Sequence, residues 1–124
     1  MCGIIGYTGE KDTKQVLLQG LCALEYRGYD SAGIALAEEN GAVHCIKSAG
    51  RVASLLEKAK NAPHGICGIG HTRWATHGAP TEKNAHPHAS ASLTLVHNGI
   101  LENAAALGKM LREQGYRFRS ETDT

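Results

Sequence analysis

Residues 1–9 read Met-Cys-Gly-Ile-Ile-Gly-Tyr-Thr-Gly, and this opening stretch places a cysteine at the start of an apolar segment. The short apolar run from Cys2 to Tyr7 is typical of a buried strand. The triplet Thr8-Gly9-Glu10 that follows it predicts a turn. We therefore expect the first strand to begin at Cys2 and to hold that thiol at one end of a sheet.

The rest of the chain alternates between helical and strand patterns. Apolar residues at helical spacing predict helices over residues 12–28, with Asp12 as the cap, and over 51–60 and 100–115. Apolar runs predict strands over residues 31–38, 42–47, 65–72, 92–97 and 116–119. The dipeptide Asn40-Gly41 predicts the turn of a hairpin. Hairpins mixed with helices indicate an α+β fold with antiparallel sheets.

Residues 73–91 contain Gly78, Pro80 and Pro87 and show little periodicity. They predict a long loop, and a loop of this length inside a compact domain is usually functional.

The composition narrows the class of protein. The chain has 124 residues, of which 42% are hydrophobic and 20% charged, and its formal net charge is +1. These values are typical of one globular domain. The scattered basic residues argue against nucleic acid or a membrane surface as a partner. The sequence contains no bilayer-spanning apolar run, and residues 1–14 do not resemble a secretory signal, so we expect a cytoplasmic protein.

Four cysteines stand at positions 2, 22, 45 and 67. Their even number permits a disulfide framework, but in a reducing cytosol we expect free thiols. The last three lie in apolar contexts, where buried small side chains explain them. Cys2 is different, because removal of Met1 would give it a free α-amine with an ordinary pKa of about 7.7–8.0. Such an amine can act as the base for its own thiol, whereas in the alternative reading Met1 is retained and Cys2 is a small buried residue.

Three further segments carry candidate site residues. Arg73, within residues 70–78, offers the planar fork that holds a carboxylate, or is an ordinary arginine at a strand end. The side chain of Asn98 and the N–H of Gly99 can stabilise an oxyanion, although Asn-Gly is also a common turn. Asp123 can hold the ammonium group of an amino acid, or is a solvated acidic residue.

The histidines raise a hypothesis of another class. Five of them fall within one third of the chain, at positions 71, 77, 86, 88 and 97. His86-Pro87-His88 could present two imidazoles to a metal, but the spacings typical of zinc sites are missing. We therefore favour packed or loop histidines and expect neither a metal nor an organic cofactor.

Taken together, the motifs are more specific than any one of them. They are, in chain order, MCGIIGY (1–7), LEYRGYDSAG (24–33), HTRWATHG (71–78), NAHPH (84–88), HNGI (97–100) and SETDT (120–124). In this order they resemble the glutaminase domain of the glutamine–fructose-6-phosphate aminotransferases (isomerising), also called glucosamine-6-phosphate synthases. The resemblance runs over residues 1–124 and covers about the first half of that glutaminase domain.

The resemblance implies an activity and a role for each residue. Cys2 would attack the side-chain amide of glutamine through a glutamyl thioester, with Asn98 and Gly99 holding the oxyanion. The substrate-binding residues it implies are Arg73 for the carboxylate, Asp123 for the ammonium group, and Trp74, Thr76 and His77 along the pocket. Residues 73–81 match the glutamine-covering loop of the family. Arg27 and Gly28 would support the nucleophile.

The resemblance also implies a fold and a wider context. The family fold is the N-terminal-nucleophile hydrolase, an αββα sandwich of antiparallel sheets, and residues 1–124 would be its N-terminal half. The domains that isomerise fructose 6-phosphate are absent, and a homo-oligomer is implied for the complete enzyme. Half a sandwich predicts exposed apolar surface. Two alternatives stay open: the glutaminase part of another class II amidotransferase, such as an amidophosphoribosyltransferase, and a non-catalytic fragment that binds glutamine or a partner.

Overall fold

The structure, a computed structural model, describes residues 1–124. Its elements are, in chain order, β1 (Gly3–Thr8), α1 (Thr13–Leu24), the 3-10 turn η1 (Glu25–Arg27), β2 (Ser31–Ala37), β3 (Val43–Ala49), α2 (Val52–Ala59), β4 (Cys67–Arg73), β5 (His88–Ala89), β6 (Thr94–Leu95) and α3 (Ala104–Glu113). Four strands form an antiparallel sheet in the order β1-β4-β2-β3, and β5 pairs with β6 in a separate sheet. The α+β class and the antiparallel sheets are therefore confirmed.

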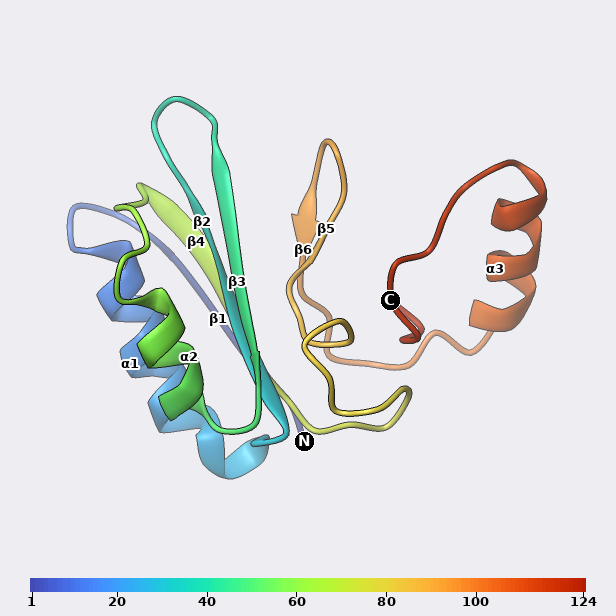
Figure 1. Cartoon of the computed structure of the whole chain (residues 1–124), viewed down its shortest axis with the longest axis horizontal. Coiled ribbons are helices and arrows are strands. Elements are labelled where there is room, and N and C mark those ends of the chain that lie inside the picture. Colours follow the sequence, from blue (N-terminus) through green and yellow to red (C-terminus); the bar gives the residue numbers. More distant parts are fainter.

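The elements are arranged in layers (Figure 1). Helices α1 and α2 cover one face of the four-stranded sheet, and the β5–β6 hairpin lies on the opposite side. Helix α3 lies beyond that hairpin, and Gly108 is its only buried residue. None of the helices combines the length and the apolar character needed to span a lipid bilayer.

Helix α1 begins at the predicted cap. The carboxylate of Asp12 accepts a hydrogen bond from the backbone N–H of Gln15 at 3.2 Å, which satisfies one of the free N–H groups of the first turn. The helix ends at Leu24, continues through η1 and stops at Gly28, as its sequence predicts. Leu17 and Leu21, one turn apart, are fully buried against the sheet.

The apolar core lies between the two helices and the sheet. It consists of Leu17, Leu18, Leu21, Ala32, Ile34, Leu36, Val52, Leu55 and Ala59. Each buried leucine or isoleucine contributes about 1.5–3 kcal/mol relative to an exposed one. All nine residues precede position 60, so the helix layer and the sheet are stabilised without α3 or the β5–β6 hairpin.

The hairpin between β2 and β3 forms where the sequence predicts it. Gly41 has a φ of +85°, a conformation that glycine adopts at little cost. The side-chain oxygen of Asn40 accepts a hydrogen bond from the backbone N–H of Ala42 at 2.8 Å. This local geometry fixes the register in which Ile34 lies opposite Ile46.

After β4, the chain packs against the face of the sheet that points away from the helices. A side chain at Gly33 in β2 would place its Cβ 2.2 Å from the carbonyl oxygen of His86. The backbone around His86 can therefore lie directly on the sheet because position 33 is glycine. This close approach brings the histidine-rich segment beside β4.

Several predicted elements of the second half are shorter than expected. Within residues 92–97 only Thr94–Leu95 are paired, and their partner, His88–Ala89, lies inside the region predicted to be loop. A strand is defined by its pairing, and β6 has no partner other than β5. The helix predicted over 100–115 is shorter and begins at Ala104. Before it, the backbone N–H of Leu101 donates to the carboxylate of Asp123 at 2.7 Å.

The strand predicted over residues 116–119 does not form. No neighbouring strand lies beside this segment, and the side chains of Tyr116 and Phe118 are exposed. Phe118 instead lies under the guanidinium of Arg112, 4.8 Å from Cζ to the ring centroid. The expected exposure of apolar surface is present here and on Leu93, Ile100, Leu101 and Met110.

Replacing Gly33 by alanine tests the close approach of His86 to the sheet. The added methyl would displace the His86 backbone, so we expect Gly33→Ala to lower the free energy of unfolding by about 1–3 kcal/mol. Gly6→Ala in β1 is the matched control, because its new Cβ would meet nothing closer than 4.0 Å. Denaturant unfolding of both variants measures the difference. Equal stabilities would show that position 33 tolerates a side chain.

Candidate active site

The nucleophile candidate Cys2 lies beside the end of strand β4. The pairing of Gly3 with Thr72 brings the residue before β1 next to the residues after β4. The backbone N–H of Trp74 donates to the Cys2 sulfur at 3.3 Å, and the thiol faces the Trp74 carbonyl oxygen at 3.7 Å. An N–H group that points at the sulfur stabilises negative charge there, and the thiolate is the reactive form of cysteine.

Asn98 and Gly99 lie next to Cys2, although they are 96 residues away in sequence. The Asn98 carboxamide nitrogen donates to the Cys2 carbonyl oxygen at 3.2 Å, and its oxygen lies 2.8 Å from Nε2 of His71. A Cβ at Gly99 would stand 2.7 Å from Nε2 of His97. The pair therefore does not form the turn of a hairpin: Asn98 is held by two contacts beside Cys2.

Arg73 is almost completely buried at the end of β4. Its guanidinium donates to three carbonyl oxygens of the following loop: those of Ala79 at 3.1 Å, of Gly78 at 3.1 Å, and of His77. These bonds use three of the five N–H groups of the guanidinium. In this structure Arg73 therefore shapes the loop after β4.

Asp30 is a site residue that sequence reasoning did not select. Its carboxylate accepts hydrogen bonds from the backbone N–H of Ala75 and from the Ser31 hydroxyl, the latter at 2.9 Å. Its own backbone N–H donates to the Arg73 carbonyl oxygen at 3.2 Å. Asp30 thus fixes the chain where it leaves β4, and the signals in the sequence were its place in the motif LEYRGYDSAG and its position directly before a predicted strand.

Asp123 is the acidic residue nearest the pocket. One of its carboxylate oxygens accepts the Leu101 N–H at 2.7 Å, and next to it the Thr124 hydroxyl lies 3.0 Å from Nδ1 of His97. These bonds tie residues 123 and 124 to the segment that carries Asn98.

A pocket of about 40 Å³ lies where these segments meet. Its lining residues are Cys2, His71, Arg73, Trp74, Thr76, His77, His86, His97, Gly99, Thr122, Asp123 and Thr124. Seven of the ten predicted site residues are among them, and Asn98 borders the pocket through its contact with Cys2. A water molecule occupies about 30 Å³ of liquid, so this volume is far smaller than an amino acid requires.

The remaining predicted residues lie around this pocket. The Trp74 ring is half exposed and packs edge-on against Tyr29 at a centroid distance of 5.2 Å. Arg27 and Gly28 do not line the pocket. Nη2 of Arg27 lies 3.7 Å from the sulfur of Met1, and a Cβ at Gly28 would meet the Arg73 carbonyl at 2.9 Å. Gly28 therefore lets the chain pass close to the end of β4.

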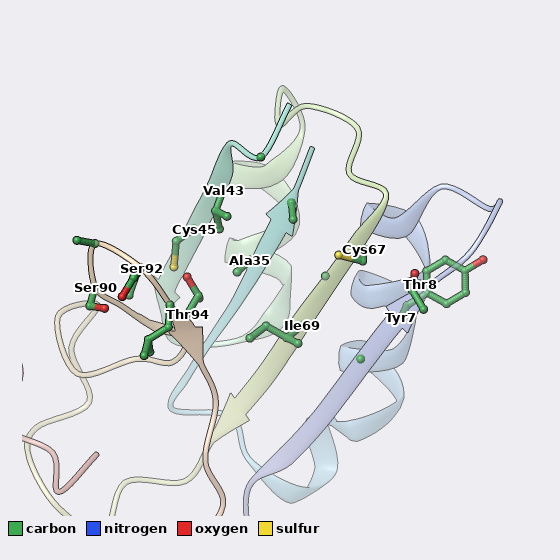
Figure 2. Close-up of a pocket in the computed structure, with 17 residues that line it drawn as sticks. Tyr7, Thr8, Ala35, Val43, Cys45, Cys67, Ile69, Ser90, Ser92 and Thr94 are labelled. Carbon is green, nitrogen blue, oxygen red and sulfur yellow. The ribbon is translucent and has the colours of Figure 1, made fainter. Parts of the chain in front are cut away.

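The largest cavity is elsewhere, on the open face of the sheet beside the β5–β6 hairpin (Figure 2). It measures about 840 Å³ and contains none of the predicted site residues. Its lining is mostly glycine, alanine and aliphatic side chains, with two thiols and five hydroxyl-bearing residues: Cys45, Cys67, Tyr7, Thr8, Ser90, Ser92 and Thr94. Burial raises the pKa of the Cys45 thiol, and the nearby positive charge of Lys47 opposes this increase only in part. No histidine and no charged side chain lines this cavity, in contrast to the pocket beside Cys2.

The rings of three central histidines, His71, His86 and His88, pack against one another in tilted and edge-on contacts. The rings of His71 and His86 lie 4.3 Å apart and those of His86 and His88 4.5 Å apart, measured between centroids. Burial lowers the pKa of His71 to about 4, of His86 to about 3 and of His88 to about 4. The three rings are therefore neutral at pH 7. No group of three or more His, Cys, Asp or Glu side chains is arranged to hold a metal ion.

Asn84 is a second residue that sequence reasoning did not select. Its fully buried carboxamide donates to the Ala79 carbonyl and to the Glu121 carboxylate, both at 3.1 Å, and accepts the Glu121 N–H at 2.9 Å. It thereby joins the loop that Arg73 holds to the segment that carries Asp123. Apart from its place in the motif NAHPH, nothing in the sequence indicated that Asn84 has this role, because the two segments that it joins lie far apart in the chain.

Replacing Asn84 by alanine tests this link. The change removes three hydrogen bonds and leaves buried polar groups unpaired, so we expect the free energy of unfolding to fall by about 2–4 kcal/mol. Asn61→Ala is the control, since Asn61 is exposed and we expect a change within about 0.5 kcal/mol. Denaturant unfolding compares the two. An Asn84→Ala protein as stable as the Asn61→Ala protein would contradict the assigned role.

Comparison with known proteins identifies the sequence relatives. No protein-family model matches the chain. Over the whole chain, it is 52% identical to the glutamine–fructose-6-phosphate aminotransferase (isomerising) of Pectobacterium atrosepticum and 54% identical to that of Thermus thermophilus. The chain spans about a fifth of the length of these relatives: 20% of the first and 21% of the second.

Solved structures identify the fold. The glutamine phosphoribosylpyrophosphate amidotransferase of B. subtilis matches 98% of this chain with a TM-score of 0.79 at 30% identity, over 27% of its own length. A structure described as the allosteric regulatory enzyme of purine biosynthesis matches 94% of this chain with a TM-score of 0.81 at 29% identity, over 26% of its length. These neighbours have the N-terminal-nucleophile amidotransferase fold, so the predicted fold is confirmed. Over its whole length, the chain is therefore similar to the N-terminal fifth of the glutamine–fructose-6-phosphate aminotransferases (isomerising).

Proposed function

We propose that this chain carries the glutaminase half of a glutamine–fructose-6-phosphate aminotransferase, which hydrolyses the side-chain amide of glutamine and supplies ammonia. The observation that carries the proposal is the junction of three segments at Cys2. The Trp74 N–H points at the sulfur, and the Asn98 carboxamide is bound to the carbonyl of the same residue. Cys2 and Asn98, the residues proposed as nucleophile and oxyanion donor, lie together at one end of the sheet.

The proposed reaction begins after removal of Met1. The α-amine of Cys2 takes the thiol proton, and the thiolate forms a carbon–sulfur bond to the amide carbon of glutamine. The carbon–nitrogen bond then breaks, and the protonated amine gives its proton to the departing nitrogen, which leaves as ammonia. Water next attacks the γ-glutamyl thioester. The products are glutamate and the free thiol, so atoms and charge balance.

Asn98 and Gly99 are proposed to stabilise the tetrahedral oxyanion. The Asn98 carboxamide has two N–H groups, and one of them is bound to the Cys2 carbonyl. The second is available for the oxyanion, together with the backbone N–H of Gly99. Loss of a single oxyanion donor typically costs about 2.7–4 kcal/mol of transition-state stabilisation.

Substrate binding is proposed to use residues that line the same pocket. Arg73 would hold the α-carboxylate through its guanidinium, and Asp123 the α-ammonium through its second oxygen. Thr76 and His77, whose side chains lie 3.3 Å apart, and Trp74 would complete the walls. The pocket measures about 40 Å³, and glutamine binding is proposed to involve movement of residues 73–81.

Arg27 and Gly28 are proposed to support the nucleophile. The guanidinium of Arg27 contacts the Met1 sulfur, and its buried Nε has no hydrogen-bond partner. It therefore lies where the new N-terminus would form once Met1 is removed. Gly28 keeps the backbone of Arg73 within reach of this region.

We also propose the kind of enzyme to which these residues belong. Residues 1–124 would be part of a class II glutamine amidotransferase domain, with fructose 6-phosphate bound by isomerase domains elsewhere in a cytoplasmic, homo-oligomeric enzyme. We propose fructose 6-phosphate as the acceptor because identity to these aminotransferases is 52–54%, against 29–30% to the phosphoribosyl amidotransferase structures. No metal or organic cofactor takes part in the proposed chemistry.

Covalent labelling of Cys2 tests the nucleophile. We expect a diazo-ketone analogue of glutamine to add once per chain, on Cys2 of protein that has lost Met1, because the activated thiolate lies in the glutamine pocket. Excess glutamine should prevent the addition, and Cys2→Ala should abolish it. The control Cys22→Ala, which removes an exposed thiol on α1, should label normally. Intact-mass measurement with fragmentation locates the adduct, and labelling elsewhere or without glutamine protection would contradict the proposal.

Replacing Asn98 by alanine tests the oxyanion role. If the amide acts mainly in the transition state, we expect Asn98→Ala to lower kcat for glutamine hydrolysis about 10²–10³-fold while KM changes little. Asn103→Ala is the control, since this exposed residue before α3 makes no side-chain hydrogen bond to the helix. Steady-state glutaminase assays give both constants. A raised KM at unchanged kcat would assign Asn98 to substrate binding instead.

A further inference from the structure

His71 is the only protein side chain that contacts the oxygen of the Asn98 carboxamide. It lies in β4 with 1% of its surface exposed, and its ring points to the face of the sheet opposite the helices, where it stacks on His86. Its Nε2 lies 2.8 Å from Oδ1 of Asn98, 27 residues further along the chain. Neither the proposed reaction nor substrate binding uses this contact.

The hydrogen-bond pattern defines the donor in this contact. The Asn98 nitrogen donates to the Cys2 carbonyl, so the carboxamide oxygen is the atom that faces His71. An oxygen can only accept, and Nε2 of His71 must therefore carry the hydrogen. Nδ1 of His71 is buried without a partner, which fits a nitrogen that bears no hydrogen.

The surroundings keep this imidazole neutral. Burial lowers the pKa of His71 to about 4, and the hydrogen bond to Asn98 only partly opposes this shift. The charge of Arg73 lowers the pKa further, while that of Asp30 raises it. His86, which stacks on the ring, is also neutral at pH 7 because burial lowers its pKa to about 3. His71 is thus a neutral donor with one fixed tautomer.

Two contacts are needed to fix a carboxamide. The bond to the Cys2 carbonyl alone would leave the Asn98 amide free to turn about that contact. The bond from His71 to the oxygen removes this freedom, and the second N–H of Asn98 then has one direction. A hydrogen-bond donor stabilises a transition state only when it is already aimed at the developing charge.

We propose that His71 is a positioning residue of the glutaminase site, whose Nε2–H holds the Asn98 carboxamide so that its free N–H points at the oxyanion. This inference rests on the proposed function for its catalytic consequence. It adds a specific role for one tautomer of one buried histidine. The competing explanation is that His71 merely fills space between the sheet and the His86 segment.

Kinetics of two variants separate these explanations. His71→Leu keeps an apolar side chain of similar volume but removes the donor, and we expect kcat for glutamine hydrolysis to fall about tenfold with KM changed less than about twofold. His71→Gln places an amide N–H near the position of Nε2, and we expect it to retain most of the kcat. His44→Leu on β3 is the control, because His44 contacts only Glu38 and lies outside the pocket. Equal losses in the leucine and glutamine variants would overturn the proposal.

A double-mutant cycle makes the test independent of folding. In the Asn98→Ala variant, the amide that His71 is proposed to orient is absent. Adding His71→Leu to this variant should therefore lower kcat less than about twofold. A residue that only fills space should cost the same factor in both backgrounds. Multiplicative losses in the double variant would therefore overturn the proposal.

Nitrogen-15 NMR of the unsubstituted protein tests the contact without any activity. We expect His71 to show the Nε2–H tautomer from pH 8 down to pH 6, and the two Asn98 side-chain N–H signals to shift in His71→Leu but not in His44→Leu. An Nδ1–H tautomer, or unshifted Asn98 signals, would overturn the positioning role. If the NMR result holds but the protein does not hydrolyse glutamine, the proposed function fails and the structural contact remains.

Discussion

The antiparallel pairing of β4 with both β1 and β2 is the constraint on which the rest of the structure depends. On one side it sets Gly3 opposite Thr72, and on the other it sets Ser31 opposite Arg73. Cys2 and Asp30, which come just before β1 and β2, therefore meet the chain that leaves β4. Because side chains alternate along a strand, a slip of one residue would turn His71 and Arg73 toward the apolar core and disrupt both layers at once.

The two faces of the sheet have different roles. Toward the helices, leucine and isoleucine side chains pack into a core that supplies most of the hydrophobic stabilisation. Toward the other side, the sheet presents Gly33 and buried polar groups, and the His86 backbone approaches closely. Buried polar groups are costly unless they are paired, and here the pairs run from β4 to Asn98 and from Asn84 to Glu121. The polar layer thus fixes the geometry of the site, whereas the apolar layer supports the sheet.

Local patterns were enough for the elements of the first 73 residues, where periodicity, the Asp12 cap and the Asn40-Gly41 turn act over short distances. They were less successful after residue 87, where β5 forms inside the predicted loop, β6 is only two residues long, and residues 116–119 find no strand to pair with. Most predicted site residues meet in one pocket. Taken one at a time, Cys2, Arg73, Asn98 and Asp123 could equally have been ordinary structural residues. Only the resemblance to a family favoured the functional interpretation of each. The sequence did not predict the roles of Asn84 and Asp30 or the contact of His71 with Asn98, because the residues that they contact are distant in sequence.

Arg73 shows how the site can couple binding to loop movement. Its guanidinium is bound to three carbonyl oxygens of the loop, and the pocket beside it has room for about one water molecule. A carboxylate is a stronger acceptor for arginine than a neutral carbonyl, since both groups in the pair are charged. A glutamine carboxylate that reaches Arg73 would therefore compete for the N–H groups that hold residues 77–79, so that the pocket widens as the substrate is bound. Asn84 also bonds the Ala79 carbonyl, and it would keep one end of the loop attached to the segment of Asp123 during this exchange.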